Sequence, residues 1–552
     1  MDALAALDLD QITDSAARQV IAVLLNRIED LHAEGERLLA ENQQLRDELA
    51  RRQGGSGRPT IRPQAGRAVA ADHSSERERR VSTPRQPRSK RATLVIDRVE
   101  PLAVDPALLP PDAQFKGYAE VVVQDLLIQP LTTCFRKETW YSPTTRQTYL
   151  ADLPPGYHGQ FGPGLKALVL ALYYGGEMSE PKLLAFLRSL GIQVADGTLA
   201  GWLIHDQDAF HAEAAAVAEA GLASSPWHHL DDTATRTDGR NGHCFVLGNP
   251  LYTRYRTLPK KDRLAVLDVL RDGRPRTFLL DAAAQTRLDD LKLAGRTRQA
   301  LTQFPHDTLL AEATLEIWLS DHLPGLGQQA GKALRETLAV AAYQAARDGP
   351  VVRLLVGDDA GQWDGVTVDG RALCWIHAGR HFKQLSPCVP QHRALLADFL
   401  ERFWDYYRDL LAYRERPSPV AAVRLEAAFD TLFATETGYR GLDARIAATR
   451  ANKAELLVVL THPEVPLHNN PAELGARQRV RKRDVSFGPR SAAGATAWDT
   501  FQTLVATARK LGVSFYHYVR DRVAETYHLP ALADLITDQA ATLHLGASWT
   551  PS

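Results

Sequence analysis

Cysteine is scarce in this sequence of 552 residues. The chain has four cysteines, none of them in a C-x-x-C pair: Cys134, Cys244, Cys374 and Cys388. So sparse a set excludes a disulfide framework and a zinc ribbon, and it is typical of a reducing compartment. We therefore expect no zinc site built on paired cysteines.

Long apolar runs and an excess of one charge are also missing. No apolar run approaches the roughly 18 residues of a membrane span, and the N-terminus M-D-A-L-A-A-L-D-L-D lacks the cationic start of a signal peptide. The net charge is −1, so the average composition excludes neither an enzyme nor a binding protein. We expect a cytoplasmic protein of two or three domains with no membrane partner.

The first segment with a clear pattern is a heptad repeat. Leucines recur every seven residues at Leu24, Leu31, Leu38 and Leu45. A second row, three residues before each position of the leucine repeat, holds the apolar residues Ile21, Ile28 and Leu49. Two companion positions hold Gly35 and Asn42, and a buried Asn favours a parallel dimer in one register. The repeat predicts a coiled-coil helix over 14–52 that pairs two copies of the chain. The alternative is an amphipathic helix that packs on its own chain.

A basic segment follows the repeat. Residues 51–91 hold twelve Arg and Lys against three Asp and Glu, with almost no large apolar side chain. Such a segment cannot bury enough surface to fold, which predicts a disordered linker over 53–92. It serves either as a solvated spacer or as a contact for nucleic-acid phosphates.

Residues 93–156 show short runs of β-forming residues. The runs are T-L-V-I, Y-A-E-V-V-V-Q-D-L-L-I, and R-K-E-T-W-Y with Q-T-Y-L. They predict a small β-rich module.

The segment 157–222 has a helical pattern. Ser179 and Pro181 mark the start of a helix that Gly191 can end, and a second helix runs through Trp202. Two short helices joined by a tight turn fit a helix-turn-helix that binds DNA, and an ordinary helical hairpin is the alternative.

The remaining sequence predicts a mixed α/β domain interrupted by helices. Three strands, W-H-H-L-D-D-T-A-T, H-C-F-V-L-G-N and L-Y-T-R-Y-R-T-L, precede a helical stretch and the buried strand V-V-R-L-L-V-G-D-D. We expect the first part of this domain over 223–372, a helical insertion over 373–462, and the completion of the domain with C-terminal helices over 463–552.

Acidic residues stand where predicted strands end. Asp231 and Asp358 end two strands, and Glu473 lies on a later helix. Carboxylates delivered to one sheet edge can hold two Mg²⁺ or Mn²⁺ ions. Each residue alone has an ordinary interpretation, such as a turn hydrogen bond or an ion pair between Glu473 and Arg477 one helical turn later. Asp359 is the alternative second acid.

Taken together, four ordered motifs resemble a DDE transposase of the insertion-sequence-66 family. The motifs are D-D-T after an apolar run at 230–233, L-L-V-G-D-D-A at 354–360, C-W-I-H-A-G-R-H-F at 374–382, and N-N-P-A-E with V-R-K-R-D-V-S-F-G at 469–488. The resemblance implies an RNase H-like catalytic core, a mixed sheet flanked by helices, with a largely helical insertion. It also implies metal-dependent cleavage and transfer of DNA strands at the ends of a mobile element.

The resemblance assigns residues by position. Asp231, Asp358 and Glu473 match the catalytic acids that hold two Mg²⁺ or Mn²⁺ ions; zinc is not expected. Cys374 and His377 match a C-x-x-H element, to which we assign a structural or positioning role together with Arg380 and His381. Metal binding is the alternative for this element. The cations near Glu473 would contact DNA: Arg477, Arg479, Arg481, Lys482, Arg483 and Arg490.

The expected partners are the terminal inverted repeats of the element and target DNA, in association with the nucleoid. A second copy of the chain and accessory proteins of the same element are further candidates. Two other functions stay open at this point: a non-catalytic DNA-binding regulator derived from a transposase, and an RNase H-like structure-selective nuclease.

Overall fold

A mixed five-stranded sheet lies at the centre of the computed structural model, which describes residues 12–52, 95–291, 293–347 and 349–549. Its strand order is β5-β4-β3-β8-β9. β3 is antiparallel to β4 and parallel to β8, so the sheet combines a hairpin meander with parallel strands. The bounds are β3 (Trp227–Thr237), β4 (Arg240–Gly248), β5 (Thr253–Leu258), β8 (Leu354–Gly357) and β9 (Arg371–Leu373). The predicted mixed α/β class is confirmed, and the order is consistent with an RNase H-like core.

Local sequence explains the two central strands. A two-residue turn, Asp238 and Gly239, joins β3 to β4 with positive φ at both residues, the pattern of a type I′ hairpin. β8 is buried along its whole length, as its run of Leu, Leu, Val and Gly requires of a strand covered on both faces.

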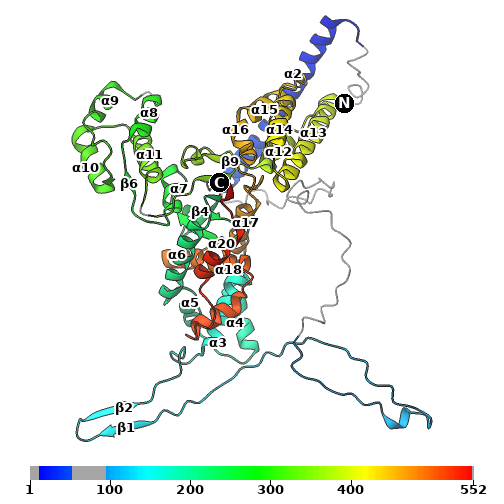
Figure 1. Cartoon of the computed structure of the whole chain (residues 1–552), viewed down its shortest axis with the longest axis vertical. Helices are drawn as coiled ribbons and strands as arrows, with labels where there is room; N and C mark the ends of the chain where they lie inside the picture. Colours follow the sequence, from blue (N-terminus) through cyan, green and yellow to red (C-terminus); the bar gives the residue numbers. More distant parts are fainter. Residues whose placement is uncertain (1–11, 53–94, 292, 348, 550–552) are drawn as a thin grey trace.

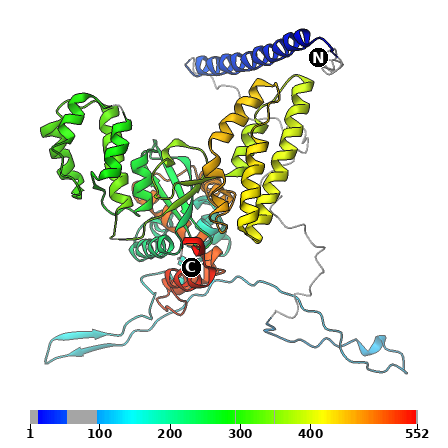
Figure 2. The same ribbon diagram turned by 45° about the horizontal axis from the view of Figure 1, so that its top comes forward.

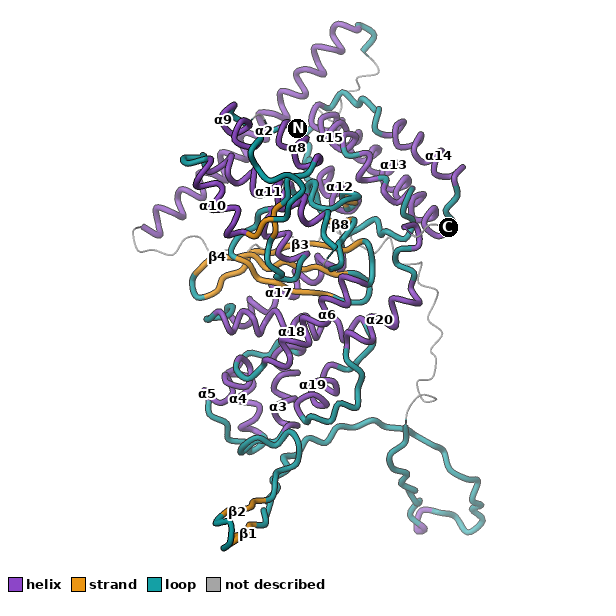
Figure 3. The backbone as a smooth tube through the Cα atoms, turned by 60° about the vertical axis from the view of Figure 1, so that its left-hand side comes forward, coloured by secondary structure: helices purple, strands orange, loops and turns teal. Residues whose placement is uncertain are grey.

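Helices cover both faces of the sheet (Figure 3). On one face, α7 (Arg263–Leu270) and α11 (Gln328–Gln344) bury an apolar cluster that includes Leu230 and Phe245 of the sheet. On the other face, α17 (Asn470–Ser486) packs on β3 and β4, and α18 (Ala492–Lys510) packs on β5.

The helices before the sheet share one core with the C-terminal helices. The bounds are α3 (Pro163–Leu170), the π-helical turn η5 (Ala171–Gly175), α4 (Glu180–Ser189), α5 (Asp196–Ile204), α6 (Asp208–Ala223), α19 (Phe515–Val523) and α20 (Leu532–Leu543). α4 and α5 lie where the sequence predicts the two short helices. The segment 157–222 therefore packs as one body with the end of the chain, and its DNA-binding role stays a prediction.

Two lobes project from the sheet (Figure 1). The first is inserted between β5 and β8 and contains β6 (Thr277–Phe278), α8 (Ala282–Asp290), α9 (Gly295–Leu301), β7 (Leu310–Ala311) and α10 (Glu312–His322). The second has its own aromatic core and contains α12 (Trp375–Lys383), α13 (Pro390–Glu415), α14 (Pro419–Leu432), α15 (Arg440–Ala451), α16 (Lys453–Leu456) and η7 (Val458–Leu460). Its helices fill the range in which the sequence predicts a helical insertion.

The N-terminal helix α2 (Ser15–Arg52) lies across the second lobe (Figure 2). Leu25 is buried against Cys388 and Val389. Glu29 accepts hydrogen bonds from the backbone N–H groups of both residues, at 2.9 and 2.7 Å, and so caps the start of α13. The leucines of the predicted seam, Leu24, Leu31, Leu38 and Leu45, are 52% to 60% exposed. Their companions Ile21 and Ile28 pack against the cluster of Leu25, Cys388 and Val389. The helix thus packs on its own chain through part of the predicted seam, and pairing through the exposed leucines stays a prediction.

The predicted β-rich module differs most from the structure. Of the described residues 95–156, only β1 (Thr139–Ser142) and β2 (Gln147–Leu150) form a ladder, with one 3₁₀ turn at η4 (Pro106–Leu108). The run 118–128 forms no strand, and Val121 and Leu127 in it are 84% exposed. The prediction is wrong for that run, because no second layer covers either face of it. The predicted linker over 53–92 lies outside the described residues.

None of the described helices combines the length and the apolar character that crossing a membrane requires.

Candidate active site

Asp231 and Asp358 lie on neighbouring parallel strands at the same level. His229 of β3 is paired with Val356 of β8, and each aspartate follows two residues after its member of that pair. Side chains two residues apart on a strand share a face, so the Asp231 carboxylate projects on the same face as His229, which α17 covers. Asp358 comes directly after β8, where the strand ends at the sheet edge.

Glu473 reaches this place because the start of α17 is fixed to β3. Asn469 donates through Nδ2 to the carbonyl oxygen of Leu230 at 2.8 Å, and its Oδ1 lies 3.0 Å from His229 Nδ1. Its backbone N–H donates to Cys374 Sγ at 3.3 Å. Glu473 stands one turn further, in the first turn of the helix.

A glycine allows α17 to lie close to the sheet. A Cβ on Gly475 would stand 2.7 Å from Val246 Cγ1, a distance that side-chain atoms do not tolerate. The Tyr255 hydroxyl donates to the Gly475 carbonyl oxygen at 3.1 Å. The helix is therefore held against β4 and β5 two residues beyond Glu473.

Asp358 and Glu473 act electrostatically on Asp231. The pKa of Asp231 is raised to about 7, mainly by burial and to a smaller extent by the negative charges of Asp358 and Glu473. A hydrogen bond from the Asp232 backbone N–H, at 2.8 Å, opposes this shift. A buried carboxyl group within electrostatic reach of two other acids favours a nearby cation. The donor set consists of carboxylate oxygens, which Mg²⁺ and Mn²⁺ prefer, so the residues fit these metals.

Neighbouring side chains orient two of the acids. Trp363 of η6 (Gly361–Trp363) donates its indole N–H to Asp358 Oδ1 at 2.7 Å, and the backbone N–H of Ala360 donates to the same oxygen at 3.2 Å. Arg380 of α12 pairs with Glu473 Oε2 at 2.9 Å. Trp363 and Asn469 are residues to which the sequence assigns no role. The signal for Asn469 was its place in the N-N-P-A-E motif, whereas Trp363 carries no signal in a single sequence.

The adjacent aspartates point elsewhere. Asp232 lies on the opposite face of β3, where it pairs with Lys261 Nζ at 2.7 Å. Asp359 faces His381 and His377 of α12, with oxygens 3.2 and 3.7 Å from their Nε2 atoms. The geometry therefore favours Asp358 over Asp359 as the partner of Asp231.

The C-x-x-H element does not form one cluster. Cys374 directly precedes α12, and its side chain is buried against the start of α17. Burial raises the pKa of its thiol to about 12, and its sulfur accepts a hydrogen bond from the Asn469 N–H. His377 faces Asp359 instead. Cys374 thus contacts the start of α17, and its structural or positioning role stays a prediction.

Two of the six predicted DNA-contacting cations are buried. Arg479 is 1% exposed and bonds Gln502, Thr257 and Asp499. Lys482 is also 1% exposed; it donates to the Tyr173 carbonyl oxygen, and burial lowers its pKa to about 7. Both hold α17 against the helices beneath it and cannot reach a phosphate. The prediction of a DNA contact is wrong for these two residues, because the sequence shows charge but not burial.

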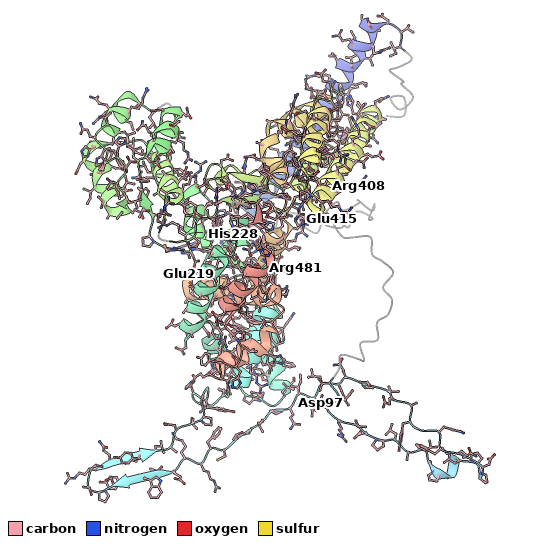
Figure 4. The ribbon with its side chains drawn as sticks, in the orientation of Figure 1. Asp97, Glu219, His228, Arg408, Glu415 and Arg481 are labelled. Carbon is pink, nitrogen blue, oxygen red and sulfur yellow. The ribbon has the colours of Figure 1, made fainter. Side chains whose placement is uncertain are left out.

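The other cations are accessible. Arg477, Arg481 and Arg490 are exposed, and Arg483 is half-buried with a bond to the Ala234 carbonyl oxygen at 2.6 Å. Arg477 and Arg481 follow Glu473 at intervals of four residues, so the three side chains share one face of α17. Figure 4 marks Arg481 on this helix and Arg408 on α13.

We expect Arg477→Ala and Arg481→Ala each to weaken DNA binding and to reduce its dependence on salt. Removing one phosphate contact lowers the slope of log K against log salt by about 1. The measurement is binding of duplex DNA by fluorescence anisotropy between about 50 and 200 mM salt. Arg408→Ala is the matched control, since this exposed arginine lies on α13. Unchanged slopes in both α17 variants would place the DNA contact elsewhere.

The sequence prediction that Asp231 ends a strand is wrong, because β3 continues to Thr237. A mixed sheet of this order, with Asp231 within β3 and Asp358 directly after β8, is consistent with an RNase H-like core. The family model described as "Transposase IS66 family" matches residues 363–497, a range that includes Glu473 and the C-x-x-H element. The chain is also 33% identical over 337 residues to the uncharacterized protein y4jO of Sinorhizobium fredii, covering 58% of this chain and 99% of y4jO. The chain belongs to the IS66 family of transposases. No solved structure matches it.

Proposed function

We propose that this protein is a DDE-type transposase that cleaves DNA at the ends of its insertion element and joins them to target DNA. The observation that carries the proposal is the placement of Asp231 in β3, Asp358 directly after the neighbouring strand β8 and Glu473 in the first turn of the helix that packs on β3, with Asp358 and Glu473 near enough to raise the pKa of Asp231. Family membership supports the same reaction class.

The three acids would hold two Mg²⁺ or Mn²⁺ ions. Ions bound there would activate the attacking oxygen and stabilise the leaving oxygen of a phosphodiester. The protein's own contribution is orientation: Trp363 fixes Asp358, and Arg380 fixes Glu473. Arg477 and Arg481 extend from the same helix face and would hold the phosphates on either side of the reacting one.

The test uses the purified full-length chain and a supercoiled plasmid that carries the inverted repeats flanking its gene. We expect nicks at the repeats in Mg²⁺, none in EDTA, and joined products when target DNA is supplied. Binding of the repeats without nicks would indicate a non-catalytic regulator. Cleavage without joined products would indicate a nuclease.

We also propose that α2 joins two copies of the chain, so that both element ends react in one assembly. The support is the row of four leucines, which stays exposed although Ile21 and Ile28 of the same repeat pack on the residues just before α13.

The double substitution Leu31→Glu and Leu38→Glu is expected to convert a dimer into a monomer. Charges placed in an apolar seam cannot be desolvated without a large cost. Light scattering coupled to gel filtration measures the mass. Leu39→Glu is the matched control, because Leu39 is 68% exposed and lies outside the seam. An unchanged mass in the double variant would contradict the proposed pairing.

A further inference from the structure

A second group of metal-ligating side chains lies beside the candidate active site. One ligand atom from each of Asp359, His377 and His381 comes within 4.8 Å of the others. The two histidines are four residues apart on α12 and so share one helix face, the spacing by which two imidazoles of one helix bind a metal ion. Asp359 comes from the loop that follows β8.

The side chains converge without completing their own interactions. Nε2 of His381 is buried and has no hydrogen-bond partner, although it lies 3.2 Å from Asp359 Oδ2. Nε2 of His377 lies 3.7 Å from Asp359 Oδ1, beyond hydrogen-bonding distance. The two rings are 4.9 Å apart at an angle of 77°. A simple network of histidine–carboxylate hydrogen bonds would satisfy these nitrogens directly.

We propose that Asp359, His377 and His381 bind a divalent transition-metal ion of the Zn²⁺ type, separate from the ions of the three acids. Metal–ligand distances of 2.0–2.2 Å in a tetrahedral site place neighbouring ligand atoms about 3.4 Å apart. The two histidine nitrogens lie 3.2 and 3.7 Å from the two oxygens of the Asp359 carboxylate, distances close to this value. Imidazole nitrogen selects Zn²⁺-type ions over Mg²⁺, which prefers oxygen ligands. The expectation against zinc rests on unpaired cysteines and does not concern this donor set.

The site is open on one side. The Asp359 side chain is 43% exposed, so three protein ligands leave a coordination position for water. The open position gives an ion access from solvent.

A bound ion would link the two segments that orient the candidate active site. The loop after β8 carries Asp358 next to Asp359, and α12 carries Arg380 between the two histidines. Arg380 pairs with Glu473. The ion would therefore fix the position of the second acid relative to the third. The metal-binding proposal itself does not depend on the proposed transposase activity.

The experiment measures Zn²⁺ binding to the full-length chain, without a histidine tag, after dialysis against EDTA. We expect calorimetry to show one Zn²⁺ per chain, unaffected by a large excess of Mg²⁺. His381→Ala and His377→Gln should each weaken binding at least tenfold, with unchanged circular dichroism. The Gln variant preserves much of the size of the side chain and guards against loss of folding.

Three controls make the result specific. Cys374→Ser tests the C-x-x-H alternative, His205→Ala removes an exposed histidine outside the cluster, and Asp231→Asn removes one of the three acids. All three should keep wild-type Zn²⁺ affinity. Absence of saturable Zn²⁺ binding to the wild type, or wild-type Zn²⁺ affinity in both histidine variants, would overturn the proposal. If Cys374→Ser loses Zn²⁺ binding and His381→Ala retains it, the ion is bound by the cysteine. Zn²⁺ binding that survives Asp231→Asn, in a protein that does not cleave DNA, would separate this proposal from failure of the proposed function.

Discussion

Asp231→Asn and Glu473→Gln should each reduce DNA strand cleavage at least about a thousandfold. Both substitutions keep the shape of the side chain and remove one negative charge from the group that would hold the metal ions. Loss of about 4 kcal/mol of transition-state stabilisation corresponds to that factor. The measurement is the initial rate of nicking at the element ends in Mg²⁺, with repeat binding measured in parallel and expected to change little.

Neighbouring aspartates provide the matched controls. Asp232→Asn alters the same residue type one position further, on the opposite face of β3, and should retain cleavage. Asp358→Asn should reduce the cleavage rate as much as Asp231→Asn does, whereas Asp359→Asn should reduce it far less. Cleavage at the wild-type rate in Asp231→Asn or Glu473→Gln would show that these acids do not form the active site. A reversed order for Asp358 and Asp359 would assign the second acid to Asp359.

In the metal-free protein, Asp231→Asn should raise the free energy of unfolding at pH 8 by on the order of a few kcal/mol. The folded-state pKa of Asp231 is about 7, raised from an ordinary value of 3.8. The folded state therefore binds more protons than the unfolded state between these values, and stability falls as pH rises from about 4 to 7. The asparagine variant does not titrate and should lack this fall, so the two proteins differ little at pH 4.

Urea unfolding at several pH values, in EDTA and in Mg²⁺, measures this effect. Mg²⁺ should stabilise the wild type more at pH 8 than at pH 6, because the ion binds the deprotonated acids. Asp232→Asn should shift stability in the opposite direction, since it leaves Lys261 without its partner. Equal pH dependence in wild type and Asp231→Asn would contradict the raised pKa.

The sequence could predict the strands of the core, since strand patterns are local, and its ordered motifs supplied the three acids that stay candidates for the site. It could not predict which face an acid takes when two stand in succession, as Asp231 and Asp232 do. The pairing of His229 with Val356 fixes the register of β3 against β8, and no local sequence signal predicts this pairing. The basic stretch shows the same limit: Arg479 and Lys482 look like their neighbours in sequence, but contacts with residues as distant as Thr257 and Tyr173 bury them.

The prediction of a β-rich module was wrong for a related reason. Runs such as Y-A-E-V-V-V have strong β propensity, but a strand needs a partner edge and a covered face, and the described residues supply neither to that run. The hairpin of β1 and β2 formed because the two segments are close enough in sequence to pair with each other.

The contact between His229 and Asn469 spans 240 residues. Because it fixes the start of α17, the three acids meet only after the chain has been synthesised beyond Glu473. Earlier in translation, Asp231 and Asp358 already lie in the polypeptide without their third member. A nascent or truncated chain that ends before Glu473 thus lacks one of the three proposed metal ligands, and under the proposed function we expect it not to cleave DNA.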